Sequence, residues 1–156
     1  MATETQALDV RSPIALDIEA EIWIDAAPEH VWKALVDDIG AWWHKAYRDE
    51  RFGVFLEPHI GGRFYEQFDE SGAGALYGLV TFFEPCKTLR LTGSFGLPGA
   101  RHYVKTYQLE ARDGGTAVRT IASLLGDIDE ETLQGYRQGG ADLLEALKRH
   151  AESRRA

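Results

Sequence analysis

The side chain with the clearest capacity for acid–base chemistry is Glu66, which alternates with Phe64 and Phe68 along the sequence. If these phenylalanines face the interior of a domain, Glu66 is a carboxyl group in an apolar cavity, where desolvation makes it a usable general acid or base. Two other arrangements remain open. The intervening polar residues face inward instead, or Glu66 forms an ion pair with Arg119.

Arg119 and His102 are the other polar side chains that suit a binding or catalytic site. Arg119 lies between Ala117 and Ile121, and an inward guanidinium there holds a ligand carboxylate by two parallel hydrogen bonds. His102 is a second candidate for the acid or base. Alternatively, Arg119 pairs with a neighbouring acidic residue or extends to the rim of the domain. In the same way, His102 and the adjacent Tyr103 can be strand residues whose polar ends face the solvent.

Aromatic residues supply candidate walls for an apolar cavity. Trp42, Trp43 and His44 are consecutive and form either an aromatic gate or a lid packed on the core. Dry walls with a few polar groups for orientation are typical of ligand pockets. The other candidates for such walls are Phe64, Tyr77, Phe82 and Tyr136.

No pattern in the sequence indicates a metal or a cofactor. There is no Gly-rich phosphate loop, no pair of histidines at metal-binding spacing and no nucleophile elbow. The 5 histidines are scattered singly, and the one cysteine, Cys86, excludes an intrachain disulfide. We therefore expect a protein that works without a metal and without a cofactor.

Composition is that of an ordinary globular protein, with 156 residues of which 44% are hydrophobic. The formal net charge of −8 argues against nucleic acid and anionic membranes as partners, because phosphate contacts need clustered lysine and arginine. Neither a secretory signal nor a long apolar run is present, so we expect a cytoplasmic protein. Residues 1–12 are polar and aperiodic and predict a loose tail before a single domain at 13–152.

Hydrophobic periodicity predicts the elements that hold these side chains. Residues 14–24 alternate between apolar and mostly acidic side chains, the pattern of a long strand with one wet face. Pro28 then begins a helix whose apolar face includes Val31 and Trp32, and a second short helix covers 38–45. About six strands separated by turn residues follow at 52–57, 63–69, 75–84, 88–93, 102–110 and 116–125.

The last element is one long amphipathic helix at 129–151. Asp127 and Asp129 can each cap its N-terminus. Leu143 and Leu147 belong to an apolar stripe, so both are expected to be buried. Consecutive hairpins make the sheet antiparallel, and only this helix is long enough to cover it. The predicted fold is therefore α+β, with an antiparallel sheet of about six to seven strands curled around the C-terminal helix.

Two adjacent glycines, Gly139 and Gly140, interrupt this helix. A glycine in a helix interior costs roughly 1 kcal/mol relative to alanine, so a compensating reason is expected. Either another backbone approaches closely at this point, or the missing side chains leave a space above the helix. The second alternative makes Gly140 part of a cavity wall.

Four stretches of the sequence occur in the order of a known family. They are 22–35, Gly61-Gly62-Arg63-Phe64, 78–85 followed by Leu89, and Tyr136-Arg137-Gln138-Gly139-Gly140. The first resembles the opening of the START-like (SRPBCC) superfamily, and the others resemble its branch of heat-shock-protein ATPase activator homologues. Members of that branch usually carry a tryptophan where this chain has Gly140. The resemblance covers about 14–150 and implies the helix-grip fold, whose cavity between helix and sheet holds lipids, sterols, hormones or polyketides and in some branches catalyses a reaction.

Three functions are compatible with this resemblance. The first is a module that binds an apolar or amphipathic small molecule between the helix and the sheet. The second is an enzyme of the cyclase or dehydratase type that uses Glu66 or His102 as acid or base. The third is a protein that docks on a chaperone, as the name of the branch implies, although no apolar docking patch is recognisable in the sequence. Either a monomer or a homodimer is expected.

Overall fold

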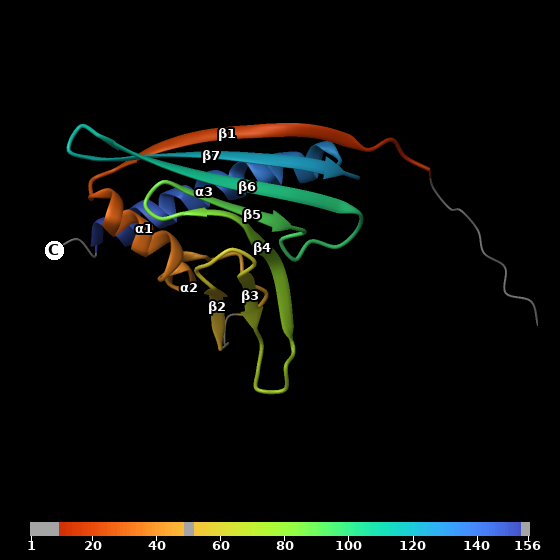
Figure 1. Ribbon diagram of the computed structural model, residues 1–156. Helices are drawn as coiled ribbons and strands as arrows, with labels where there is room; N and C mark the ends of the chain where they lie inside the picture. Colours follow the sequence, from red (N-terminus) through yellow and green to blue (C-terminus); the bar gives the residue numbers. More distant parts are fainter. Residues whose placement is uncertain (1–9, 49–51, 154–156) are drawn as a thin grey trace, which may run out of the picture.

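The computed structural model describes residues 10–48 and 52–153, and it has a seven-stranded antiparallel sheet with a long helix along one face (Figure 1). The strands are β1 Ile14–Ile24, β2 Gly53–Leu56, β3 Arg63–Gln67, β4 Gly74–Glu84, β5 Thr88–Gly93, β6 Arg101–Arg112 and β7 Gly115–Gly126, and the helices are α1 Pro28–Val36, α2 Ile39–Trp42 and α3 Glu130–Ser153. The α+β helix-grip fold predicted from the sequence is confirmed. Most of the predicted tail at 1–12 lies outside the described residues. No helix in the described part of the chain is long and apolar enough to cross a membrane.

The sheet has the order β1-β7-β6-β5-β4-β3-β2, and its inner face is the one that α3 covers (Figure 1). The register places Ala20 of β1 beside Thr120 of β7, and Thr120 in turn beside Tyr107 of β6, so these three residues share the inner face. Irregular register in β3 and β4 accompanies the bend of β4 away from the long strands. The sheet thus curls around the helix.

Helices α1 and α2 close one end of the sheet. Helix α1 begins with Pro28 at its first position, where the missing N–H is not needed, as predicted. Helix α2 is a single turn, shorter than predicted, and ends at Trp42, whose indole Nε1 donates to the carbonyl of Ala34 at 2.8 Å. The backbone of Trp43 is extended, and its ring packs edge-on against Phe64 of β3 at 4.9 Å between centroids.

Helix α3 has two halves that meet the sheet differently. It begins at Glu130, and the carboxylate of Asp129 accepts a hydrogen bond from the backbone N–H of Thr132 at 2.7 Å, as expected of an N-cap. Within this helix, all of which is described, the buried residues belong to the C-terminal half and are Leu144, Ala146, Leu147 and Ala151. Leu143, which was expected to be buried, is only half-buried because it lines a cavity.

The apolar core is divided into a large cluster and a small one. The large cluster joins α1, α2 and the sheet to the C-terminal half of α3. In the small cluster, Leu133 and Tyr136 from the other half of α3 pack against Ala122, Leu124 and Ile128. The middle of α3 therefore lies between two packing sites and belongs to neither.

Candidate functional site

Two hollows border the middle of helix α3, and both are lined by Tyr103, Tyr136 and Gly140. The first, here called the apolar pocket, has a volume of about 370 Å³. Its other lining residues are Trp43, Lys45, Phe95, Leu97, Thr132, Gly135, Gly139 and Leu143. The second, here called the lysine pocket, has a volume of about 460 Å³, lies between β1 and α3 and includes Lys105.

Four aromatic rings from four parts of the chain form one wall, here called the aromatic wall. Trp43 follows α2, Phe95 lies in the loop after β5, Tyr103 is in β6 and Tyr136 is in α3. The ring centroids are 6.5 Å apart for Trp43 and Phe95, 4.4 Å for Phe95 and Tyr103, and 5.8 Å for Tyr103 and Tyr136. Phe95 has a positive φ of 56°, a conformation that costs energy for a bulky residue. Its backbone N–H donates to the carbonyl of Tyr77 at 2.8 Å, which holds the ring in place.

The glycines of α3 leave open space beside this wall. A Cβ added at Gly140 would lie 3.8 Å from Nζ of Lys105, and one at Gly139 would lie 3.6 Å from Cε of Lys45. Near Gly135, the described residues place no atom within 4 Å of such a Cβ. These are ordinary van der Waals separations, and the nearest atoms belong to flexible side chains rather than to a backbone. The geometry favours the cavity-wall explanation for Gly140 over close backbone contact.

Lys105 is a buried cation on the inner face of β6. Only 7% of its surface is exposed, and its ammonium nitrogen lies 5.7 Å from the centroid of the Tyr107 ring. Among the described residues, no carboxylate pairs with it and no group accepts a hydrogen bond from its side chain. Burial lowers the pKa of Lys105 to about 8, so the side chain still carries its proton at neutral pH.

Two further polar atoms near this place are buried without a partner. Within 10–48 and 52–153, neither the indole Nε1 of Trp43 nor the hydroxyl of Tyr136 has a hydrogen-bond partner. The neighbouring Trp42 differs, because its Nε1 donates to the carbonyl of Ala34. Nearly all buried polar groups in native proteins are hydrogen-bonded. Unpartnered polar groups on residues that line a pocket are therefore suited to a ligand with hydrogen-bonding atoms.

Glu66 is buried beside Phe64, as the first of the three arrangements considered from the sequence requires, but it is not available for catalysis. Its side chain is 0% exposed and accepts three hydrogen bonds. The donors are the backbone N–H groups of Tyr47 at 2.7 Å and Arg48 at 2.9 Å, and the hydroxyl of Tyr77 at 2.5 Å. Burial raises the pKa of Tyr77, so that hydroxyl remains a donor. The carboxylate is a structural anchor for the segment after α2.

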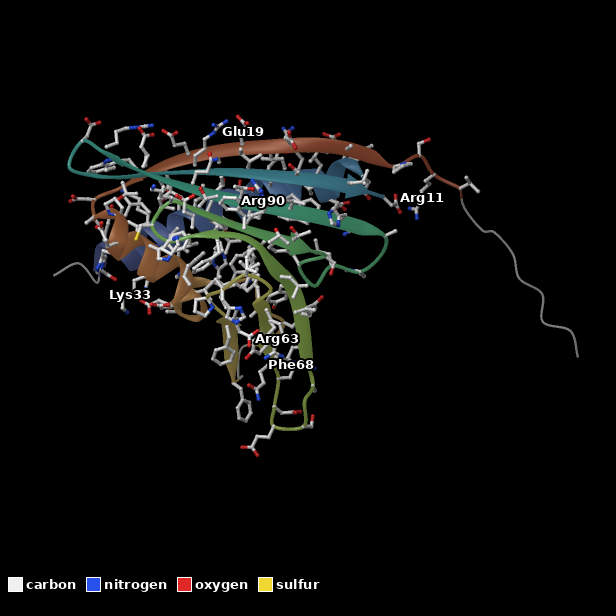
Figure 2. All side chains as sticks on the ribbon, in the orientation of Figure 1. Arg11, Glu19, Lys33, Arg63, Phe68 and Arg90 are labelled. Carbon is white, nitrogen blue, oxygen red and sulfur yellow. The ribbon has the colours of Figure 1, made fainter. Side chains whose placement is uncertain are left out.

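Three predicted cavity residues lie instead on the outer face of the sheet. Phe82 is 41% exposed, because the register of β4 shifts between Val80 and Phe82. His102 is exposed, since its neighbour Tyr103 takes the inward position in β6. Arg119 donates to Glu19 at 3.0 Å, and Figure 2 shows Glu19 on the side of β1 that faces away from α3. The prediction that these three residues line a cavity is therefore wrong. The suggested ion pair between Arg119 and Glu66 does not form, because Arg119 pairs with Glu19 instead.

His44 lies outside both pockets as well. It is exposed and lines a separate groove between α2 and α3, next to Asp142 and His150. Trp42 is buried and packs on the core, so the suggested gate reduces to Trp43 alone. Among the residues that the structure describes, no three His, Cys, Asp or Glu side chains gather into a group that could hold a metal ion.

Lys105 and Phe95 are among the residues of the site that escaped the sequence analysis, and of these two only Lys105 carried a usable signal. Lys105 alternates with Tyr103 and Tyr107, so an inward orientation of either tyrosine also places Lys105 inside. Phe95 lies in an irregular loop, where no hydrophobic period assigns a direction to a side chain.

One family model matches the sequence. The model described as "Activator of Hsp90 ATPase homolog 1-like protein" matches residues 25–152. No curated protein matches the sequence significantly.

Several solved structures share the fold. A structure of a protein from Rhizobium leguminosarum has 18% sequence identity and a TM-score of 0.74, over 93% of this chain and 99% of that one. A protein from Mesorhizobium loti has 22% identity and a TM-score of 0.64, over 90% and 100% of the two chains. The Aha1 dimer from Colwellia psychrerythraea, solved in solution, has 24% identity and a TM-score of 0.62, over 88% and 96%. At such identities the likeness establishes the fold alone.

Proposed function

This chain belongs to the family of Activator of Hsp90 ATPase homolog 1-like proteins, and from that premise we propose that it binds an amphipathic small molecule between helix α3 and the sheet. The observation that carries the proposal is the apolar pocket of about 370 Å³ at the middle of α3. Pockets for small molecules commonly have volumes of roughly 300–1,000 Å³, apolar or aromatic walls and a few polar groups. The apolar pocket has each of these properties.

The walls of the pocket are held by packing that exists before any ligand arrives. Trp43 is packed against Phe64, and Tyr103 is packed between Phe95 and Tyr136. Burial raises the pKa of Tyr103, so its hydroxyl is neutral and can donate a hydrogen bond. A wall of this kind loses little conformational entropy on binding, which favours affinity.

The glycines in α3 support the same proposal. Gly135, Gly139 and Gly140 together cost roughly 3 kcal/mol of helix stability relative to alanines. No described backbone comes close enough to require them. Their effect is to keep side chains out of the space between the helix and the aromatic wall, and a ligand can use that space.

The acid–base alternative loses its support. The carboxylate of Glu66 is occupied by three donors, and His102 is exposed on the outer face of the sheet. Neither side chain reaches a substrate in the apolar pocket. A reaction of the cyclase or dehydratase type that depends on these two residues is therefore not part of the proposal.

Docking on a second copy of this chain is the second candidate, because β2, β3 and β4 expose apolar side chains. Phe55, Tyr65 and Leu76 are paired across the three strands, and Leu79 is 42% exposed nearby. Exposed apolar groups that gather on one face mark interaction sites in many proteins. This surface is separate from the apolar pocket, so the two candidates can be tested with different variants.

Calorimetric titration with decan-1-ol tests ligand binding. We expect the protein to bind this probe and expect Gly140→Trp to abolish binding while the fold is retained, because the indole fills the pocket. Gln138→Trp is the matched control, since it places the same ring on an exposed position of α3 that lines neither pocket. Undiminished binding by Gly140→Trp rejects the proposal, and so does failure of the unmodified protein to bind either decan-1-ol or its carboxylate analogue decanoate.

The docking candidate has its own measurement. Leu76→Ser removes an apolar side chain that is 53% exposed, and it leaves the pocket untouched. A lower association constant of this variant in sedimentation equilibrium, with unchanged binding of decan-1-ol, supports a docking surface on β2–β4. Identical sedimentation of the variant and the unmodified protein argues against self-association through this face.

A further inference from the structure

We propose that the ligand carries a single carboxylate, that the ammonium group of Lys105 binds this carboxylate beside Gly140, and that the apolar body lies against the aromatic wall. The inference rests on the proposed function, because it names the chemical class of the molecule that the same site binds. It adds a specificity-determining residue that the fold alone does not identify.

The first argument is the charge of Lys105. A buried ammonium is costly unless it is paired with an anion or with hydrogen-bond acceptors. The inner-face groups around it, such as Tyr107, carry no negative charge at neutral pH. Asp17 and Glu19 of β1 also line the lysine pocket. Their carboxylates accept hydrogen bonds from Ser123 and Arg119, however, and are not paired with Lys105. The lowered pKa of about 8 still leaves the side chain mostly protonated at pH 7. Within residues 10–48 and 52–153, the fold thus leaves this ammonium group without a paired anion at the edge of a cavity.

The second argument is access to that charge. Nζ of Lys105 lies 3.8 Å from the position of a Cβ on Gly140, and Gly140 lines both the apolar pocket and the lysine pocket. A side chain at 140 would begin in van der Waals contact with the ammonium group, so glycine leaves the approach to it open. A ligand that lies along Gly140 therefore places one end against Lys105 and keeps its body beside Tyr103 and Tyr136.

The third argument is the set of neutral hydrogen-bonding groups. Tyr136 has a buried hydroxyl and Trp43 a buried indole N–H, and neither has a partner in the part of the chain that is described. A carboxylate has about four acceptor positions on its two oxygens, so it can accept from Lys105 and from a tyrosine hydroxyl together. One buried cation matches a monoanion, whereas a phosphate with nearly two charges would require more.

Two other cations line these pockets, and they compete with Lys105 for the same role. Lys45 belongs to the apolar pocket and Arg137 to the lysine pocket, and both side chains are exposed. Hydrated cations attract anions weakly, so we expect them to contribute less than Lys105 does. A test of the inference must separate Lys105 from Lys45.

The test compares decanoate with decan-1-ol, two probes with the same chain length and different head groups. Calorimetric titration at pH 7 should show that the unmodified protein binds decanoate more tightly, by on the order of 10-fold to 100-fold, which is typical of a buried charge-assisted hydrogen bond. This comparison needs no variant. Equal affinities, or a preference for the alcohol, overturn the inference and leave the proposed function standing, whereas binding of neither probe rejects the proposed function itself.

Variants then locate the charge. Lys105→Met should remove the preference for decanoate and leave the affinity for decan-1-ol within about twofold, and Lys105→Gln should do the same if the methionine variant folds poorly. Lys87→Met removes an exposed lysine from the turn between β4 and β5 and serves as the matched control. If Lys45→Met removes the preference and Lys105→Met retains it, the carboxylate binds at the rim and the inference is wrong.

Discussion

Two charged side chains are buried on the inner face of the same sheet, and their surroundings are opposite. Glu66 in β3 is fully buried and accepts hydrogen bonds from two backbone N–H groups and a tyrosine hydroxyl. Lys105 in β6 is nearly as buried, yet the described residues offer its ammonium group neither an anion nor an acceptor. The first charge is part of the architecture, and the second is available to a ligand.

The difference teaches that burial of a charge does not by itself indicate a functional site. What distinguishes the two is whether the fold supplies partners and whether open space adjoins the group. The region of Glu66 is packed by Phe64 and Tyr77, whose ring centroids are 5.1 Å apart. The region of Lys105 adjoins Gly140, where the helix presents no side chain. We therefore expect a ligand to bind beside Lys105 and not beside Glu66.

The largest effect is expected from breaking the packed region. Glu66→Ala leaves the Tyr77 hydroxyl and two backbone N–H groups without their acceptor, and we expect a loss of about 2–4 kcal/mol in the free energy of unfolding. Urea denaturation measures the loss. The exposed Glu70→Ala is the control and should change stability by less than about 0.5 kcal/mol. A similarly small loss for Glu66→Ala would show that the carboxylate is not an anchor.

Removal of the unpaired charge should act in the opposite direction. Lys105→Met keeps the length of the side chain and removes an ammonium whose pKa is lowered from 10.5 to about 8, so we expect stability at pH 7 to rise by roughly 1–3 kcal/mol. Thermal and urea denaturation should agree on the sign. A destabilised Lys105→Met variant would mean that the ammonium has a stabilising partner, and the contrast with Glu66 would disappear.

The pH dependence of the same pair of proteins sharpens this result. Because the pKa of Lys105 is lowered by burial, the unfolded chain retains this proton between about pH 8 and 10.5 while the native protein releases it. The stability of the unmodified protein relative to Lys105→Met must therefore rise with pH across this window. The penalty is fully present below about pH 8 and absent above about pH 10.5. A stability difference that does not change with pH would assign the effect to packing.

The fold was predictable because its signals are periodic or local. The alternation of 14–24 predicted β1, and Pro28 predicted the start of α1. Asp127 and Asp129 were both candidates for the N-cap of α3, and Asp129 takes that role. Each of these rules acts over a few neighbouring residues. Leu147 was predicted to be buried and is 0% exposed, because the apolar stripe is continuous at that end of the helix.

The site was less predictable, because the inward face of a strand cannot be identified when both of its faces carry polar as well as apolar residues. Arg119 shares its face with Ala117 and Ile121, which suggested an inward face, whereas the inner face holds the polar Thr120. The donors to Glu66 come from a segment 18 and 19 residues away that has no periodic pattern. No rule based on neighbouring residues could have found them.

The smallest expected effect decides what the glycine in the open region is for. Gly140→Ala adds a methyl group that meets only Nζ of Lys105, at 3.8 Å, so helix propensity should dominate and raise stability by up to roughly 1 kcal/mol. Gly135→Ala is the matched control on the same helix, because the described residues place no atom within 4 Å of its Cβ. Urea denaturation of both variants should give gains of the same sign and similar size. If Gly140→Ala loses stability while Gly135→Ala gains it, then a close contact occupies the middle of α3, and Lys105 does not face open space.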